Sequence, residues 1–437
     1  MKIHLSLQEQ LKLIKYFLQW LLRIAPIAII IGSACALFLW SLDTVTTIRL
    51  QNDWLLFLLP LAGVLVAFVY QKLGRSVQGG NNLIVEEIHE PSAGVPIRMA
   101  PLVYIGTIIT HLFGGSAGRE GTAVQIGGSI SSFAAQKLGL TKSSHRIMMM
   151  AGMAAGFGAV FGTPLAGAVF ALEVLAIGKM EYDALIPCLM ASVIGDLTCR
   201  VWGIHHEAFS IISSSTQLAS GAYFQAEWTL LLKVVIASIL FAMASVMFSE
   251  LSHKLISLFK KFVKQPLLRP VVGAVAIIIL TYLLGTRDYL GLTATSPTEH
   301  SISIVSAFRE GGVGYMSWFW KLLFTAITLS SGFIGGEVTP LFFIGAALGN
   351  VLALLLGAPV DLFAALGFVA VFAGATNTPL ASLILSVELF GSGNLVYFAV
   401  ACFLSYLFSG NSTIYQSQRL AFSKDGTTKQ QKVTSKT

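Results

Sequence analysis

Long apolar runs, separated by short polar segments, recur along the whole chain. They fall near residues 16–41, 54–70, 147–176, 184–203, 227–249, 268–286, 318–334, 361–376 and 394–409. Several reach the roughly 20 residues that a helix needs to cross the hydrocarbon core of a bilayer. Others are shorter or are interrupted by Gly and Pro. We therefore expect broken helices at membrane depth, where non-helical backbone must be buried in protein or reached by water.

The composition supports a membrane protein and excludes an ordinary soluble domain. Of the 437 residues, 55% are hydrophobic and only 11% are charged, whereas soluble domains carry about 25% charged residues. We predict an all-α polytopic membrane protein. The four cysteines lie in or beside apolar runs without CxxC spacing, so we predict no disulfide, no metal site and no cofactor.

The net charge of +7 arises from basic residues that flank the apolar runs. These residues form three clusters: Lys2, Lys12 and Lys15; Lys254, Lys260, Lys261, Lys264 and Arg269; and Arg419, Lys424, Lys429, Lys432 and Lys436. By the positive-inside rule all three clusters face the cytoplasm, and so do both termini. A nucleic-acid partner is the alternative explanation of a basic chain, but charges that flank membrane spans argue against it.

Two pairs of matching segments indicate an internal repeat. Residues 162–173 read GTPLAGAVFALE and residues 377–388 read NTPLASLILSVE; residues 118–122 (GREGT) match residues 335–339 (GGEVT) at nearly the same offset. Duplicated membrane halves commonly pack as inverted repeats, with the substrate site at their interface.

The repeat leads to the following predicted organisation. The N-terminus covers 1–15, the first membrane half 16–249, a basic cytoplasmic connector 250–269, the second half 270–410, and a terminal helix start with a basic tail 411–437.

Four glycine-containing segments have the composition of helix starts that could bind an anion. They are residues 79–84, 118–122, 335–340 and 410–415. A helix start presents backbone N–H groups without partners and a partial positive charge, and glycine lets an anion approach the backbone closely. For a single such segment, a tight turn between packed helices is the simpler explanation. Four segments, two of them related by the repeat, favour anion binding.

Glu120 lies in the second of these segments, where a charged group is costly and usually functional. Its ionised carboxylate could occupy the same cradle as a transported anion, and protonation would release it. One side chain could then compete with the substrate and carry a proton. The alternative is a structural ion pair with Arg119, which we disfavour because adjacent residues on a helix do not face each other.

The segments GREGTAVQIGG (118–128) and AGMAAGFGAVFGTPLAGAVFALE (151–173) resemble the CLC family of chloride channels and anion/proton exchangers. The resemblance implies inverted repeats of tilted, broken helices, and a homodimer in which each subunit has its own pathway. It also implies that the segments 163–175 and 378–390 lie near the dimer interface.

Three departures from the family's usual motifs resemble its fluoride-selective bacterial branch. Residues 80–84 read GNNLI, so Asn81 stands where chloride carriers have a serine; Thr122 replaces a proline; and Glu337 stands in GEVTP at 336–340. By this resemblance the anion-binding residues are Asn81, Asn82, Gly118, Arg119, Gly121, Thr122, Val338, Thr339 and Tyr415. For Tyr415 an interfacial aromatic anchor is an equal alternative.

A further departure concerns proton coupling. Proton-coupled chloride members carry an internal glutamate where this chain has Val174. Coupling is then absent, or another group relays protons. Glu337 is the candidate, because the repeat relates it to the gating and coupling residue Glu120. The alternative is that Glu337 is a helix-start acid bound by local N–H groups.

Together these features predict a fluoride/proton antiporter in the bacterial inner (plasma) membrane. It would export fluoride from the cytoplasm, driven by the proton gradient. A chloride/proton exchanger or chloride channel of the same family is the alternative. A membrane enzyme that uses Glu120, Glu337 and His111 is a more distant one, because the chain has no metal-ligand spacing or nucleophile motif. We expect no enzymatic activity and no nucleic-acid partner.

Overall fold

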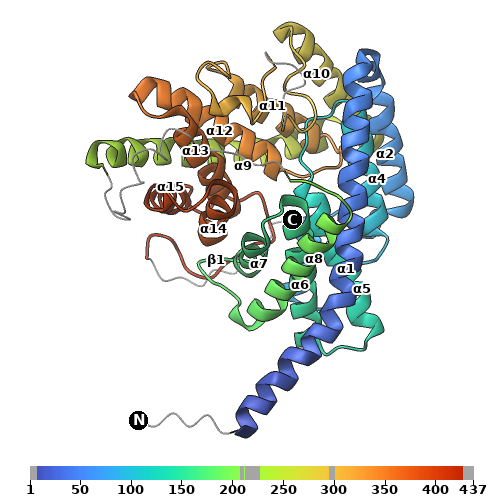
Figure 1. Ribbon diagram of the computed structural model, residues 1–437. Coiled ribbons are helices and arrows are strands. Elements are labelled where there is room, and N and C mark those ends of the chain that lie inside the picture. The colour runs from blue at the N-terminus through green and yellow to red at the C-terminus, as the bar shows by residue number, and fades with distance from the viewer. Residues whose placement is uncertain (1–6, 207–210, 212–226, 295–300, 427–437) are drawn as a thin grey trace.

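The computed structural model describes residues 7–206, 211, 227–294 and 301–426, and almost all of these lie in or between helices (Figure 1). Six helices in the described part are long and apolar enough to cross a membrane: Glu9–Gln51, Asp53–Leu73, Tyr182–Val201, Trp228–Phe262, Pro266–Leu284 and Val338–Leu356. The chain is therefore a multi-pass membrane protein, as its composition predicts.

The helices form two consecutive series. The first is α1 (Leu7–Gln51), α2 (Leu59–Leu73), α3 (Asn81–His89), α4 (Met99–Leu112), α5 (Glu120–Lys137), α6 (Lys142–Phe161), α7 (Pro164–Glu173) and α8 (Leu185–Val201). The second is α9 (Trp228–Phe262), α10 (Arg269–Leu284), α11 (Ser317–Ser330), α12 (Val338–Leu356), α13 (Val360–Thr376), α14 (Pro379–Phe390) and α15 (Leu395–Phe408). Short 3-10 turns lie at Asp53–Leu58, Arg75–Val77, Tyr182–Ala184, Pro266–Leu268 and Ser306–Phe308.

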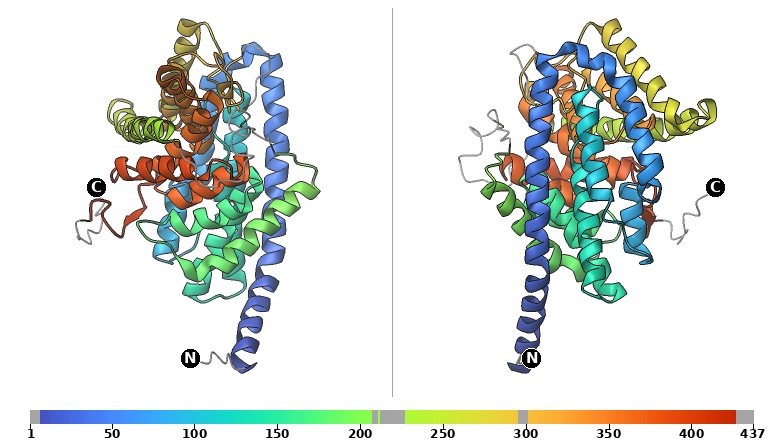
Figure 2. Two further views of the ribbon diagram at one scale, coloured as in Figure 1. Left: turned by 60° about the vertical axis from the view of Figure 1, so that its left-hand side comes forward. Right: turned by 90° about the vertical axis from the view of Figure 1, so that its right-hand side faces the viewer.

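The two series, of eight and seven described helices, have a similar order. Each series opens with its longest helix: α1 stands along one side of the molecule (Figure 2), and α9 packs against α11, α13 and α15 of its own series. Segment 250–262 continues α9 without a break. Most of the predicted connector 250–269 is therefore helical, as the last turns of α9. The basic segment 250–262 thus extends α9 beyond its apolar run.

One predicted apolar run, 147–176, is two helices. Gly162 adopts a left-handed backbone with φ 70°, which ends α6, and Pro164 then begins α7. Proline suits a first helical turn because it needs no N–H partner there. The break leaves α7 too short to span a membrane alone, and α7 packs against α14 of the second series.

The halves contact each other through equivalent residues, as a two-fold relation requires. Glu173 at the end of α7 accepts hydrogen bonds from the backbone N–H groups of Leu380 and Ala381, at 3.1 and 2.9 Å. Glu388 of α14 accepts from Leu165 and Ala166, at 2.9 and 2.8 Å. Each glutamate thus satisfies the first N–H groups of the opposite helix and the positive end of its dipole.

Within each half, glycine pairs bring two helices into close contact. A side chain on Gly127 of α5 would collide with the carbonyl of Gly152 in α6. The equivalent pair in the second half is Gly345 of α12 and Gly367 of α13. Small residues at such contacts are typical of membrane helices, whose association depends on close packing.

Phenylalanines fill the space where the two halves meet. Phe161 of α6 and Phe342 of α12 have ring centroids 5.3 Å apart, and Phe170 of α7 stacks on Phe372 of α13 at 6.0 Å. Phe342 also stacks on Phe368 at 3.9 Å. This buried aromatic cluster is rigid, so it holds the central helix starts in fixed positions.

The C-terminal segment differs from the prediction of a fourth helix start at 410–415. Residues 411–418 form turns, and β2 (Arg419–Leu420) then pairs in parallel with β1 (Ala176–Ile177). Polar side chains fix this segment instead of helical bonds: Gln418 donates to the carbonyls of Val174 and Thr376, both at 2.9 Å. The segment therefore connects the ends of α7 and α13 and holds Tyr415 inside the molecule.

The reciprocal contacts of Glu173 and Glu388 predict a specific loss of stability. Glu173→Ala and Glu388→Ala each leave two N–H groups at an internal helix start without an acceptor. We expect each variant to lower the free energy of unfolding by about 1–3 kcal/mol and to lower the thermal midpoint measured in detergent.

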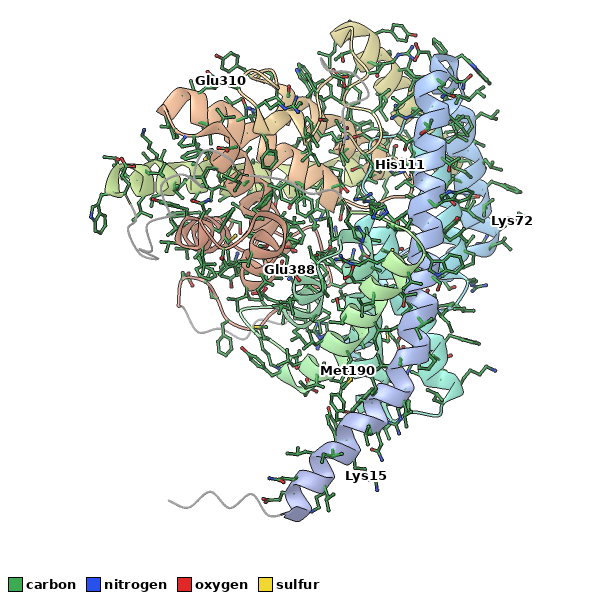
Figure 3. All side chains as sticks on the ribbon, in the orientation of Figure 1. Lys15, Lys72, His111, Met190, Glu310 and Glu388 are labelled. Atoms are coloured by element: carbon green, nitrogen blue, oxygen red, sulfur yellow. The ribbon has the colours of Figure 1, made fainter. Side chains whose placement is uncertain are left out.

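Glu310→Ala is the matched control. Glu310 is exposed at the edge of the molecule, whereas Glu388 lies near its middle (Figure 3). If both capping variants have the same thermal midpoint as the control and the parent chain, the reciprocal contacts do not stabilise the fold.

Candidate functional site

The two repeated glycine segments lie against each other at the centre of the molecule. Gly118 and Gly336 form an isolated antiparallel bridge, with N–H to carbonyl distances of 2.6 and 2.8 Å. The bridge places the N-terminus of α5 beside the N-terminus of α12. The sequence repeat thus corresponds to a real junction, in which each half supplies one helix start.

The Glu120 side chain reaches from α5 to the start of α12. Its Oε2 accepts a hydrogen bond from the backbone N–H of Thr339 at 3.0 Å, and its Oε1 accepts one from the Thr339 hydroxyl. Glu120 is 1% exposed. A buried carboxylate therefore occupies the positive end of α12, where an anion is stabilised by unpaired N–H groups and by the helix dipole.

Arg119 also contacts this carboxylate. Its backbone N–H donates to Glu120 Oε2 at 3.1 Å, and its Nε lies 3.6 Å from Oε1. The argument from helix geometry against this ion pair is wrong. Arg119 is the residue before the helix, with φ −114°, so the rule for neighbours within a helix does not apply.

Glycine is required at two positions of this junction because the backbones approach so closely. A Cβ on Gly118 would lie 2.9 Å from Glu120 Oε2, and one on Gly336 would lie 2.8 Å from the backbone nitrogen of Gly121. Real Cβ atoms are almost never found at such distances. Larger residues would therefore displace the carboxylate or separate the two helix starts.

Glu337 occupies the position before α12 but does not cap that helix with its side chain. Among the described residues its carboxyl group forms no hydrogen bond or ion pair. The alternative of a helix-start acid bound by local N–H groups is therefore wrong. Glu337 is a half-buried acidic group without a partner, directly beside the cradle that holds Glu120.

Tyr415 lies on the other side of the same junction. It is only 5% exposed, so the alternative of an interfacial anchor is wrong. Both Glu337 and Glu120 are close enough to interact electrostatically with its hydroxyl. That hydroxyl forms no hydrogen bond within the described part of the chain, and it is thus available to another ligand.

Asn81 and Asn82 approach the junction from α3. A Cβ on Gly121 would lie 3.0 Å from Asn81 Nδ2, while Asn81 Oδ1 is buried without a partner. Asn82 Oδ1 accepts from the backbone of Ser417 at 3.1 Å. Asn81 therefore offers an amide donor at the start of α5, whereas Asn82 fastens the C-terminal segment.

The remaining predicted residues have more local contacts. The Thr122 hydroxyl lies 2.7 Å from that of Thr107 in α4, so it faces α4 and not the Glu120 carboxylate. Val338 is buried, with 2% exposure, in the first turn of α12.

The sequence prediction gave no supporting role to the polar residues around the junction, which lie in α4, in α11 and between α4 and α5. His111 is fully buried, and its ring nitrogens lie 2.8 and 3.0 Å from the carbonyls of Thr107 and Ala117 (Figure 3). Ser116 pairs with Thr325 of α11 at 2.9 Å between their hydroxyl oxygens. The sequence does show polar residues within the two apolar segments that form α4 and α11, and these residues could have indicated such a role.

These features define a multi-pass helical membrane protein whose two repeated halves join broken helices at a central, buried site. The family model for voltage gated chloride channels matches residues 62–410. The chain therefore belongs to this family, the CLC family.

Curated relatives of the chain include channels and exchangers. It is 44% identical over 416 residues to the "Chloride/fluoride channel protein" of Pseudomonas syringae pv. tomato, covering 95% of this chain and 90% of the relative. It is 23% identical over 312 residues to an H(+)/Cl(−) exchange transporter of Vibrio cholerae, covering 68% and 64%. These relatives are named as channels and transporters, not as enzymes.

Solved structures show the same fold. A CLC-type fluoride/proton antiporter superimposes with a TM-score of 0.86 and 33% sequence identity, covering 95% of this chain and all of that one. A slow cyanobacterial Cl−/H+ antiporter gives a TM-score of 0.71 at 20% identity, covering 89% of this chain and 94% of that one. The predicted fold class is confirmed.

Proposed function

We propose that the protein is a fluoride/proton antiporter that exports fluoride from the bacterial cytoplasm. One observation carries this proposal: the carboxylate of Glu120 occupies a cradle of N–H and O–H donors at the start of α12. A site that holds one buried anion can hold another of similar size in its place. The similarity to a structure described as a fluoride/proton antiporter supports fluoride as that anion.

Exchange follows from competition for this cradle. While Glu120 is ionised, its carboxylate takes the donors of Thr339 and excludes fluoride. Protonation removes the charge that the helix dipole attracts, so the side chain leaves and fluoride can enter. Proton uptake and fluoride binding are then linked events, and an inward proton gradient drives fluoride outward.

Glu337 and Tyr415 extend this pathway toward the side of the C-terminal segment. Val174 is buried and apolar, with 1% exposure, so it cannot carry a proton. Glu337 has no partner among the described residues. Both Glu337 and Glu120 interact electrostatically with Tyr415. We assign Glu337 the role of proton relay, and Tyr415 that of a hydroxyl donor to the anion.

The positions of the basic clusters support a cytoplasmic location for both termini. Ser412, near the start of the tail, donates to Glu250 of α9 at 3.4 Å. The tail strand β2 pairs with β1. All three clusters flank apolar runs, and the positive-inside rule then places them on the cytoplasmic side. Lys2, Lys429, Lys432 and Lys436 lie outside the described residues.

The first prediction of this proposal concerns Glu120. Glu120→Gln keeps the size of the side chain but cannot titrate, so a fluoride gradient should no longer move protons, whatever happens to fluoride flux. Purified protein in liposomes, with fluoride and pH recorded together, measures both. Fluoride-driven proton uptake that persists in Glu120→Gln would refute the mechanism.

Glu337→Gln tests the proton relay in the same assay. As a relay, Glu337 is needed for proton movement, and the variant should move fewer protons per fluoride. Unchanged coupling with altered fluoride affinity would instead assign Glu337 to anion binding alone.

A second prediction concerns selectivity between fluoride and chloride. The Asn81 amide approaches the start of α5, and its size limits the anion that fits there. Asn81→Ser enlarges this space, so chloride throughput should rise relative to fluoride, by about tenfold if 1.4 kcal/mol of discrimination is lost. Parallel flux measurements with the two halides give the ratio. An unchanged ratio would remove Asn81 from the selectivity argument.

A third prediction concerns assembly. We infer a homodimer whose interface includes the outer faces of α7 and α14. The small residues of these helices pack within the chain, but Leu165 and Leu380 are 50% and 38% exposed. Mass measurement in detergent should give a dimer, and Leu165→Trp together with Leu380→Trp should shift it toward monomer. A monomeric parent chain would contradict this assembly.

A further inference from the structure

A lysine of the C-terminal tail contacts the ends of two apolar helices. Lys424 is half-buried, although it belongs to the short segment that follows β2. Its ammonium donates hydrogen bonds to Asn377 Oδ1 at 2.5 Å, to the Tyr406 carbonyl at 2.6 Å and to the Ser409 hydroxyl at 3.0 Å. These three acceptors match the three N–H groups of a charged ammonium.

The position of this ammonium suits a positive charge. Asn377 directly follows α13 and Ser409 directly follows α15, so both residues mark the C-terminal end of a helix. The last carbonyl groups of a helix have no partner within it, and the helix dipole places a partial negative charge there. The ammonium also lies 3.9 Å from the centre of the Tyr406 ring, within the range of a cation–π contact. A single cation thus binds the ends of both helices.

The side chain of Asn377 connects this lysine to the segment that contains Tyr415. Asn377 is only 1% exposed. Its Oδ1 accepts from Lys424, while its Nδ2 donates to the Ser412 carbonyl at 3.0 Å and to Gln418 Oε1 at 3.1 Å. A reversed amide would turn N–H groups toward the ammonium and an oxygen toward two other oxygens. The ammonium therefore fixes the orientation of the Asn377 amide.

Gln418 and Thr413 complete the connection to Tyr415. Gln418 Oε1 accepts from the Thr413 hydroxyl at 2.8 Å, and that hydroxyl accepts from the backbone N–H of Tyr415 at 3.1 Å. The Tyr415 carbonyl accepts from the backbone N–H of Gln418 at 3.0 Å. Four hydrogen bonds in series therefore join the ammonium to the backbone of the tyrosine. We call the three intervening residues, Asn377, Gln418 and Thr413, the tail link.

Tyr415 lies between the tail link and a second anchor. Ser417 donates from its backbone N–H to Asn82 Oδ1 at 3.1 Å and from its hydroxyl to Glu86 Oε1 at 2.7 Å, both in α3. The two anchors fix the backbone on either side of the tyrosine. The place of the tyrosine hydroxyl depends on that backbone, and small displacements of a group that binds a transported ion are costly.

We propose that Lys424 is a positioning residue for anion transport, whose ammonium sets the place of the Tyr415 hydroxyl through the tail link. This inference rests on the proposed function, in which Tyr415 donates to the transported fluoride, and it gives the C-terminal tail a part in that site. Without the ammonium, the buried Oδ1 of Asn377 loses a partner, which favours a reversed amide and breaks the tail link. Tyr415 is then anchored from α3 alone.

The test is a double-mutant cycle on fluoride transport by the full chain in proteoliposomes. Lys424→Met removes the ammonium and keeps a long side chain. It should raise the half-saturating fluoride concentration by roughly 2–10-fold, the loss that corresponds to one hydrogen bond. Tyr415→Phe should raise it by a similar factor. Because Lys424 acts through the tyrosine hydroxyl, the double variant should resemble Tyr415→Phe alone.

Two outcomes of this cycle would overturn the inference. The first is a half-saturating fluoride concentration that Lys424→Met leaves unchanged. The second is a double variant in which the factors of the two single variants multiply, because Lys424 then acts independently of the tyrosine.

Lys137→Met is the matched control. Lys137 is an exposed residue in the last turn of α5, and its ammonium lies 5.6 Å from the centre of the Phe133 ring. It is thus another lysine at a helix end beside an aromatic ring, but it is not bonded to the tail link. The loss of this ammonium should leave half-saturation unchanged.

Chemical rescue separates positioning from a general loss of folding. Lys424→Cys can be alkylated with bromoethylamine, in which the thiolate displaces bromide and an ammonium returns at nearly the original length. Iodoacetamide adds a neutral amide at the same sulfur. All four native cysteines are buried, so the new thiol is the accessible one. The aminoethyl adduct should return half-saturation toward the parent value and the amide adduct should not. Equal effects of the two adducts would contradict a role for the charge.

The outcomes distinguish this inference from the proposed function. If the parent chain moves fluoride without protons, the proposed antiport fails. If the parent chain couples the two ions but Lys424 and Tyr415 act independently, only the positioning role of Lys424 fails.

Discussion

The structure depends on one constraint: a helix that begins inside a membrane protein must find partners for its first N–H groups. At three helix starts in the described part of the chain, the partner comes from the other half. Carboxylates accept the hydrogen bonds of these N–H groups: Glu173 at the start of α14, Glu388 at the start of α7 and Glu120 at the start of α12. Neither half could bury its broken helices alone, because each N–H group without a partner costs free energy in an apolar environment.

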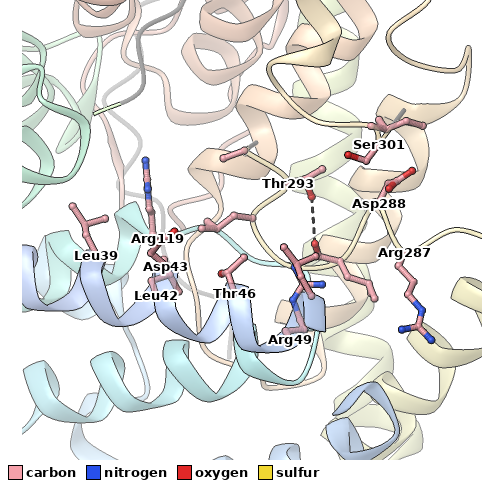
Figure 4. A pocket seen from close by; sticks show the side chains of 15 residues that line it. Leu39, Leu42, Asp43, Thr46, Arg49, Arg119, Arg287, Asp288, Thr293 and Ser301 are labelled. Atoms are coloured by element: carbon pink, nitrogen blue, oxygen red, sulfur yellow. Dashed lines mark hydrogen bonds between the residues drawn. The ribbon is translucent and has the colours of Figure 1, made fainter. Parts of the chain in front are cut away.

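The same constraint gives the site its chemistry. A donor set that stabilises a carboxylate in a dry interior also stabilises a small inorganic anion. At α7 and α14 the carboxylates lie at the ends of tightly packed helices, so they act as structural caps. At α12 the carboxylate lies 3.6 Å from the Nε of Arg119, and that arginine also lines a cavity of about 260 Å³ (Figure 4). The difference between a cap and a gate is therefore set by the surroundings, not by the hydrogen bonds themselves.

Much of this arrangement could be predicted from the sequence. The broken helices, the internal repeat, and the residues at the central junction all followed from glycine, proline and charge at unusual places. The helical continuation through 250–262 was not predicted, because the basic end of α9 has the composition of a loop; packing against α11, α13 and α15 anchors the helix that carries it. The segment 411–418 was misassigned because side chains such as Gln418, and not helical bonds, fix it.

Other features are not encoded locally at all. Nothing in the sequence around Lys321 reveals that its ammonium binds the segment 289–293, because the contact joins separate parts of the second half. The approach of Arg119 to Glu120 depends on a single backbone angle before α5. Both contacts result from tertiary packing, which patterns of hydrophobicity and motif spacing do not resolve.

The central junction is symmetric in backbone but not in side chains, and this asymmetry suits transport. The two-fold relation that takes Glu120 and Thr339 to Glu337 and Thr122 predicts a second carboxylate bound at the start of α5. Glu337 makes no such contact among the described residues, and the Thr122 hydroxyl binds Thr107 instead. One of two equivalent cradles is thus occupied by an internal anion while the other is not. If carboxylates occupied both helix starts, neither would be open to a transported anion. With only one start occupied, an anion can bind while the Glu120 carboxyl group is protonated and displaced.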